Sequence, residues 1–229
     1  MALPQARFQP ASDQSLLVVL GNEISLKTHR RVAALLHELQ QQPIPGIVNL
    51  HPAYCSLLIV FDALALRHSE LEQTLRSYLD RADDVAQPEP RRIEIPVCYD
   101  AEFGLDLQEV AAACSLPVEA VIEMHCANDY LAYFLGFVPG FAYLGDLPEP
   151  LIVPRLDSPR RQVPRGSVAI AGRQTGIYPL ATPGGWRILG RTPLAMFRPD
   201  RERPSLLSPG DRVRFHPISR HQFSALERP

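Results

Sequence analysis

Residues 136–144 read GFVPGFAYL, residues 154–172 read PRLDSPRRQVPRGSVAIAG, and residues 172–194 read GRQTGIYPLATPGGWRILGRTPL. Glycine permits backbone angles that other residues avoid and proline fixes its own, so this composition is typical of tight turns. Apolar runs at 168–170, 188–189 and 195–197 lie between the turns and indicate short buried strands rather than a disordered linker. We therefore expect an ordered scaffold whose loops carry a binding site.

The same pattern extends on both sides of this stretch. From residue 130 to about residue 217, short apolar runs alternate with proline and glycine turns, and helical periodicity is absent. This pattern predicts an all-β barrel or sandwich. The polar tail after Ile218 is expected to fray.

Two helices are predicted immediately before the barrel, at 107–114 and 118–127. Asp106 and Glu109 have the spacing of a capping box at the start of the first helix. Ser115 and Pro117 precede the second. The two helices therefore open the second domain.

Residues 15–97 form a separate pattern in which strand-like and helix-like segments alternate. The predicted elements are strands at 16–20, 47–50, 57–61 and 93–97 and helices at 26–39 and 71–79. Their order is βαββαβ, which is the split-βαβ arrangement of ferredoxin-like domains. The chain is thus predicted to be α+β, with a ferredoxin-like domain at 1–95 and a second domain at 96–229.

Composition limits the possible partners and location. The net charge of −2 gives no bias toward nucleic acid or anionic membranes. No apolar run approaches the ~18 residues of a membrane helix, and the first residues lack the apolar core of a signal peptide. The four cysteines form no CxxC pair. We expect a soluble cytoplasmic protein without a metal site or an organic cofactor.

Lysine is nearly absent from the chain. Lys27 is the only lysine among 23 basic residues, and no glycine loop precedes it. Because the Walker A motif needs a lysine after its last glycine, this chain has no P-loop.

Arginines cluster in the glycine-rich stretch. Arg160 and Arg165 each follow a proline that restricts the backbone. Arginine suits bidentate capture of carboxylate or phosphate, so these two side chains are candidates for an anion clamp. The alternative is a solvated basic loop.

A second group of candidates follows the arginines. Gln174 and Tyr178 offer an amide and a phenol around a glycine turn, whereas Thr182, Gly184 and Gly185 offer a hydroxyl and approachable backbone N–H groups.

Trp186 is either a pocket wall or a core anchor of the barrel. His125 is interpreted as a core or interface histidine. The sequence contains no GxSxG elbow, and the catalytic residues stay unassigned.

The motifs above resemble the family of 5-oxoprolinase B subunits, also called the KipI or allophanate hydrolase subunit 1 family. The resemblance covers nearly the whole chain. It rests on GFVPGFAYL, the PR…SPR…VPRGSVAIAG run, QTGIYP and TPGGWRILGRTPL in this order. Arg173 departs from the pattern, because a small residue is expected there.

The resemblance implies a cyclophilin-like β-barrel for the second domain and a hetero-oligomer with two sister 5-oxoprolinase subunits, namely the carboxyltransferase-like C subunit and the A subunit. It implies that the complex hydrolyses the lactam of 5-oxo-L-proline to L-glutamate with cleavage of ATP. ATP would be bound by or shared with the partner subunits, because this chain lacks a P-loop. Substrate-binding residues would come from the candidates named above.

Two alternatives stay open. The chain is a KipI-like inhibitor that binds a sporulation-type histidine kinase, or it belongs to a carboxyltransferase-type complex acting on urea or allophanate. The enzyme reading predicts that Arg165→Ala lowers the activity of the reconstituted complex at least about tenfold, with Arg228→Ala as a silent control.

Overall fold

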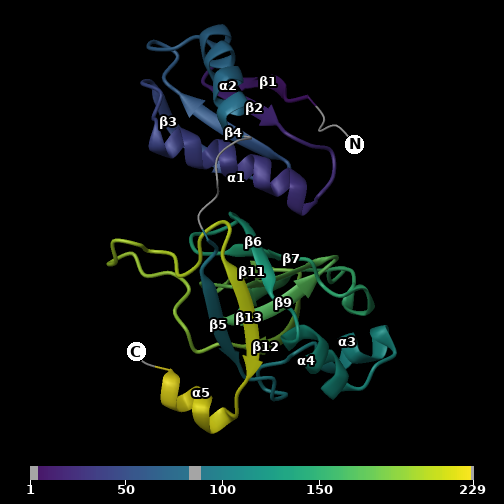
Figure 1. The fold of residues 1–229 in the computed structure, drawn as a ribbon. Helices are drawn as coiled ribbons and strands as arrows, with labels where there is room; N and C mark the ends of the chain where they lie inside the picture. The colour runs from purple at the N-terminus through teal and green to yellow at the C-terminus, as the bar shows by residue number, and fades with distance from the viewer. Residues whose placement is uncertain (1–4, 83–88, 228–229) are drawn as a thin grey trace. The chain divides into compact units, whose positions relative to one another are not determined.

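The computed structural model describes residues 5–82 and 89–227, so Arg228, the control position named above, lies outside the described residues. The chain divides into two compact units, Met1–Glu89 and Pro90–Pro229 (Figure 1). Each unit has its own hydrophobic core.

The first unit is a four-stranded antiparallel sheet in the order β1-β2-β4-β3, with two helices. Its elements are β1 (Arg7–Ser12), β2 (Ser15–Val19), α1 (Leu26–Gln41), β3 (Ile47–Pro52), β4 (Ser56–Phe61) and α2 (His68–Ala82). Leu57, Ile59 and Phe61 alternate along β4 and are buried with the fully buried leucines of the helices. Ser25 caps α1 by accepting a hydrogen bond from the backbone N–H of Thr28.

The ferredoxin-like assignment is not confirmed, and its last strand was predicted wrongly. β5 (Arg92–Val97) pairs in parallel with β13 (Arg212–Pro217) in the second unit, where Ile95 and Val97 are fully buried. The edge position next to β2 is taken by β1, which forms a hairpin with β2. Because β1 is mostly exposed, it lacks the apolar alternation by which strands are recognised.

The second unit contains a seven-stranded sheet in the order β12-β9-β10-β7-β6-β13-β5. A bridge between Cys98, just after β5, and Arg191 on β12 brings the two edges together, so the sheet is nearly closed into a barrel. A separate two-stranded sheet pairs β11 with β8. The remaining strands are β6 (Tyr130–Leu135), β7 (Ala142–Gly145), β8 (Arg160–Val163), β9 (Ser167–Ala171), β10 (Gln174–Ile177), β11 (Thr182–Gly184) and β12 (Arg187–Arg191). The predicted barrel is thereby confirmed as a barrel-like sheet. The strand predicted at 195–197 is wrong, because Met196 is buried in a loop and Phe197 forms only an isolated bridge with Ser205.

The predicted helical pair is confirmed as α3 (Leu107–Cys114) and α4 (Val118–Cys126). The capping box at α3 was predicted wrongly, because the Asp106 side chain makes no capping hydrogen bond. Its carboxylate binds Arg160 and the backbone N–H of Ile188 instead.

The fraying tail was also predicted wrongly. Residues after Ile218 form helix α5 (Arg220–Leu226), which starts with a capping box between Ser219 and Gln222. Phe223 is buried and stacks on Phe103, with ring centroids 4.5 Å apart. The Ser-x-x-Gln spacing was a readable signal for this helix.

Candidate functional site

Strand β10 separates the barrel interior from a second, outer cluster of side chains. Thr175 and Ile177 point inward, toward His125 and the main core. Gly176 lies between them and faces Phe141 and Trp186 on the other side. Because side chains alternate along a strand, Gln174 and Gly176 share the outer face. Ala169 and Ala171 of neighbouring β9 also belong to the outer cluster.

Four rings form the centre of this outer face, and we call them the aromatic cluster: Phe141, Tyr143, Tyr178 and Trp186. Phe141 lies 5.4 Å from both Tyr178 and Trp186 in edge-on geometry, and Tyr143 lies 5.9 Å from Trp186. Edge-to-face contacts at these distances are favourable. The cluster therefore holds the outer face of the barrel in a fixed shape.

Phe137 marks an accessible edge of the aromatic cluster. Its ring is in edge contact with Phe141 and Tyr178, although 58% of the residue is exposed. Its φ of 69° places it in the left-handed region, which non-glycine residues rarely adopt. Leu180, two residues after Tyr178, is 42% exposed. At Phe137 the cluster thus has an apolar rim open to solvent.

The packing of the aromatic cluster explains why positions 176 and 184 are occupied by glycine. A Cβ on Gly176 would lie 2.9 Å from the Phe141 ring, and a Cβ on Gly184 would collide with the Tyr178 hydroxyl. The space at Gly184 that we expected a ligand to use is therefore filled by Tyr178. At Gly185 the nearest side chain, Pro159, is 3.6 Å from an added Cβ, and the Gly185 carbonyl accepts a hydrogen bond from the Leu156 N–H.

Arg160 is engaged inside the protein. Its Nη1 and Nη2 donate to the two oxygens of Asp106 at 3.0 and 2.5 Å, and the Asp106 side chain is only 2% exposed. The β8–β11 pairing places Arg160 opposite Gly184. Arg160 therefore lies opposite another candidate residue, but two of its donors are used by a buried carboxylate.

Arg165 is exposed in the turn between β8 and β9. Its carbonyl accepts a hydrogen bond from Arg191 Nε at 2.7 Å. The following N–H, of Gly166, donates to the Tyr178 carbonyl, so this turn adjoins the aromatic cluster.

Arg155, which the sequence did not single out, is an exposed cation next to the aromatic cluster. Its guanidinium lies 6.0 Å from the centre of the Trp186 ring, and the residue is exposed. Within the described ranges no carboxylate forms an ion pair with Arg155. Arg155 belongs to the arginine-rich stretch, but the sequence does not show that its loop lies against Trp186.

The remaining candidates are the polar groups of the outer face. Gln174 is half-buried. The Thr182 hydroxyl is buried and donates to the Pro183 carbonyl at 2.7 Å. Burial raises the pKa of the Tyr178 phenol, while the Trp186 backbone and Arg155 act in the opposite direction. Tyr178 is therefore an uncharged donor near neutral pH.

The inner face of β10 contains a closed polar network. His125 is fully buried; its Nδ1 lies 2.9 Å from the Tyr99 hydroxyl and its Nε2 lies 3.0 Å from Thr175 Oγ1. Since Thr175 donates its proton to the Ala169 carbonyl, it must accept from Nε2–H. Burial lowers the pKa of His125 to about 3. The interpretation of His125 as a core histidine is confirmed.

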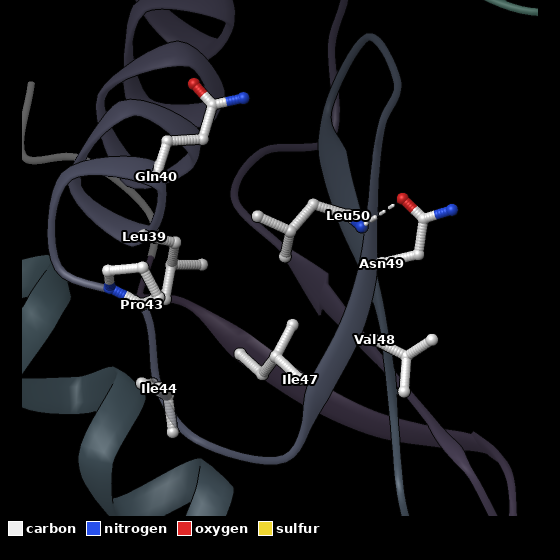
Figure 2. Close-up of a pocket in the computed structure, with 8 residues that line it drawn as sticks. All are labelled: Leu39, Gln40, Pro43, Ile44, Ile47, Val48, Asn49 and Leu50. Carbon is white, nitrogen blue, oxygen red and sulfur yellow. Dashed lines mark hydrogen bonds between the residues drawn. The ribbon is translucent and has the colours of Figure 1, made fainter.

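The first unit has an apolar concavity of about 260 Å³ between the end of α1 and β3 (Figure 2). Its polar side chains are Gln40 and Asn49, and Asn49 Oδ1 accepts a hydrogen bond from the Leu50 N–H at 2.8 Å. None of the predicted site residues lines it.

In residues 5–82 and 89–227, no cluster of three histidine, cysteine or acidic residues is arranged to hold a metal ion. The helices in these two ranges include none with the length and apolarity needed to span a membrane.

Comparisons with known proteins agree with this architecture. Residues 6–207 match the family described as carboxyltransferase domain, subdomain C and D. The 5-oxoprolinase B subunit of Bacillus subtilis is 40% identical over 229 residues, which cover 96% of this chain and 95% of the relative. The corresponding protein of Escherichia coli O157:H7 is 41% identical, covering 94% of this chain and 97% of the relative.

A solved structure titled TTHA0988 shares the fold, with a TM-score of 0.80 and 41% identity over 90% of this chain and 40% of that chain. The chain belongs to the family of 5-oxoprolinase B subunits.

Proposed function

We propose that this chain is the component of a 5-oxoprolinase that holds 5-oxo-L-proline at the rim of the aromatic cluster. The observation that carries the proposal is Arg155, an exposed cation above the Trp186 ring without a carboxylate partner in the described part of the chain. Arginine binds carboxylates through two parallel hydrogen bonds, and 5-oxo-L-proline carries one carboxylate.

The rest of the substrate matches the remaining groups of the outer face. The five-membered lactam ring is compact and largely apolar, so it can contact Phe137 and the edge of Trp186. The lactam amide needs a donor and an acceptor, which the Gln174 side chain supplies. Thr182 and the Gly185 segment complete the polar side of this surface, with Arg165 as a second cation from the adjoining turn.

The chemistry requires activation of an unstrained amide, which water opens slowly. Transfer of the γ-phosphoryl group of ATP to the lactam oxygen creates an electrophilic ring carbon. Attack of water at that carbon opens the ring, and a second water completes release of phosphate, giving L-glutamate, ADP and phosphate. This chain binds and orients the lactam. ATP is bound by the sister subunits of the complex, since the chain has neither a P-loop nor a lysine beyond Lys27.

A second function is favoured by a different observation. Phe137, in edge contact with the aromatic cluster, is 58% exposed, and exposed apolar side chains are typical of protein-binding surfaces. A KipI-like inhibitor would use this rim to bind a histidine kinase. Co-purification with the A and C subunits of the complex, rather than with a kinase dimerisation domain, distinguishes the enzyme component from the inhibitor.

The decisive experiment measures glutamate release by the reconstituted complex. Removing a charge-assisted hydrogen bond costs about 1.5–3 kcal/mol, so Arg155→Ala should lower kcat/KM roughly ten- to a hundredfold through a higher KM. The chain alone should show no turnover. Arg161→Ala, which removes an exposed arginine of the same stretch, is the matched control and should keep near-normal kcat/KM. Equal kcat/KM for Arg155→Ala and the unsubstituted complex would reject this site.

A further inference from the structure

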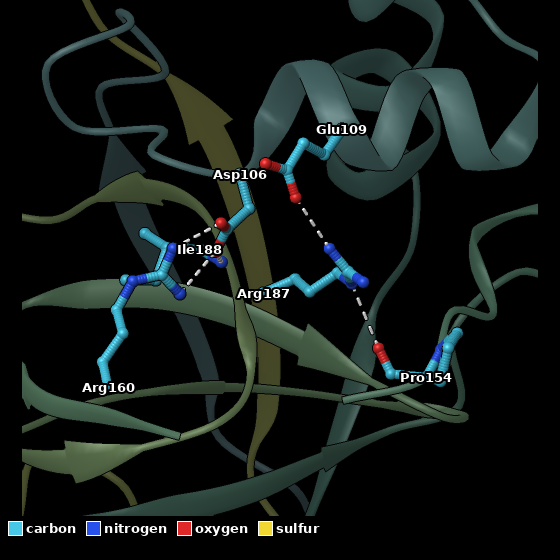
Figure 3. A network of polar contacts seen from close by, with 6 residues as sticks. All are labelled: Asp106, Glu109, Pro154, Arg160, Arg187 and Ile188. Carbon is cyan, nitrogen blue, oxygen red and sulfur yellow. Dashed lines mark hydrogen bonds and ion pairs between the residues drawn. The ribbon is translucent and has the colours of Figure 1, made fainter. Parts of the chain in front are cut away.

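The first turn of α3 and the residue before it present two carboxylates, each bound to a different arginine (Figure 3). Asp106 binds Arg160 and Glu109 binds Arg187. The two acidic residues are three positions apart, which places them on one side of the helix start. Their spacing resembles a capping box, but the structure gives both carboxylates tertiary partners instead.

Asp106 joins three segments at a buried point. Its Oδ2 accepts hydrogen bonds from the Ile188 backbone N–H, at 2.6 Å, and from Arg160 Nη1. In return, the Asp106 backbone N–H donates a hydrogen bond to the Ile188 carbonyl at 2.9 Å. The carboxylate therefore ties β12 at Ile188 to β8 at Arg160. Since Asp106 is almost fully buried, removing the arginine would leave its charge uncompensated.

Glu109 binds Arg187, the residue of β12 that precedes Ile188. The Glu109 carboxylate accepts a hydrogen bond from Arg187 Nη1 at 3.0 Å, and Arg187 Nε donates one to the Pro154 carbonyl at 3.2 Å. Arg187 is largely buried, whereas Glu109 is 67% exposed at its side chain. The carboxylate thus orients an arginine whose second donor holds the backbone immediately before Arg155.

Backbone contacts complete the fixation of this loop. The Leu156 N–H donates to the Gly185 carbonyl at 2.8 Å, and Val153 forms a bridge with Gly172. Arg155 is therefore held by its neighbours on both sides while its own side chain stays exposed. A cation presented on a fixed backbone loses less conformational freedom when it binds an anion.

We propose that Asp106 and Glu109 are positioning residues that clamp residues 154–160 against β12 and so keep Arg155 above Trp186. The proposal deepens the proposed function and rests on it for the part that concerns the substrate. The clamp itself is a structural claim that can be tested without substrate.

The test compares Glu109→Gln and Asp106→Asn with Glu119→Gln, which removes a similar exposed carboxylate from the first turn of α4. The first readout is hydrogen exchange of the isolated chain. The Leu156 N–H should exchange at least about threefold faster in both clamp variants, with Glu119→Gln unchanged. Glu109→Asp should restore part of the protection. Unchanged Leu156 exchange in both clamp variants would overturn the clamp, whatever the substrate is.

The second readout is the kinetics of the reconstituted complex. The clamp variants should raise KM for 5-oxo-L-proline about three- to tenfold with little change in kcat, because only the presentation of Arg155 is disturbed. Faster exchange with unchanged KM would overturn the positioning role. If Arg155→Ala is itself without effect, the proposed substrate site fails, and the exchange data still decide the clamp. Should Asp106→Asn not fold, Glu109→Gln supplies both readouts, since its side chain is mostly exposed.

Discussion

The two faces of β10 differ in whether their polar side chains are hydrogen-bonded within the protein or exposed to solvent. On the inner face, Tyr99, His125 and Thr175 satisfy one another and end at the Ala169 carbonyl. On the outer face, Arg155 is exposed beside Trp186 and forms no ion pair among the described residues. A closed network stabilises a core, whereas cations without partners beside fixed aromatic rings are available to a ligand. This difference favours binding at the outside of the barrel.

Unlike Arg155, Arg160 is bound to a buried carboxylate. Its replacement should therefore have the largest effect on the free energy of unfolding. Arg160→Ala leaves the Asp106 carboxylate buried with the Ile188 N–H as its remaining partner. Breaking such a pair costs about 3 kcal/mol in the free energy of unfolding. Urea denaturation measures this loss. The double variant with Asp106→Asn should recover part of it, and a loss below about 1 kcal/mol would show that Arg160 belongs with the available cations.

Burial of His125 on the inner face should make the free energy of unfolding depend on pH. The folded-state pKa of His125 is about 3, below its ordinary value of 6.5. Between these values the unfolded chain binds a proton that the folded chain excludes, so stability is complete above pH 6.5 and falls as the pH decreases. Lowering the pH from about 7.5 to about 5 should reduce the free energy of unfolding by about 2 kcal/mol. Comparing unfolding of the unsubstituted chain and His125→Gln isolates this contribution. Parallel pH profiles would contradict the closed network.

Arg165→Ala should have the smallest effect on stability, because the side chain is exposed and forms no ion pair within residues 5–82 and 89–227. We expect the free energy of unfolding to change by less than about 0.5 kcal/mol. The activity of the complex should nevertheless fall about tenfold if Arg165 reaches the substrate, as proposed. Unchanged activity would restrict the cationic part of the site to Arg155. Loss of co-purification with the sister subunits would assign Arg165 to an interface.

Several candidate residues that the sequence indicates lie close together in the structure, but the contacts of each arginine could not be predicted. Gln174, Tyr178 and Trp186 are candidates because amide, phenol and indole groups stand among glycines, and all three lie on or next to the outer face. Arg160 is a candidate because arginine suits anion capture and Pro159 restricts its backbone, yet it binds Asp106, which is 54 positions away. The sequence contains no signal for that pairing, because a long-range ion pair depends on how α3 and β8 are packed.

Local elements could be read directly from the order of the amino acids. The ends of α3, the strands of the second unit and the turns at its glycines follow from periodicity and backbone preferences that act within a few residues. The sheet that each strand joins depends instead on long-range packing. β5 has the alternation of a half-buried strand, and this pattern fits either unit. Burial of Ile95 and Val97 in the same core as Phe215 placed it in the barrel, because strand pairing depends on which distant apolar surface is available.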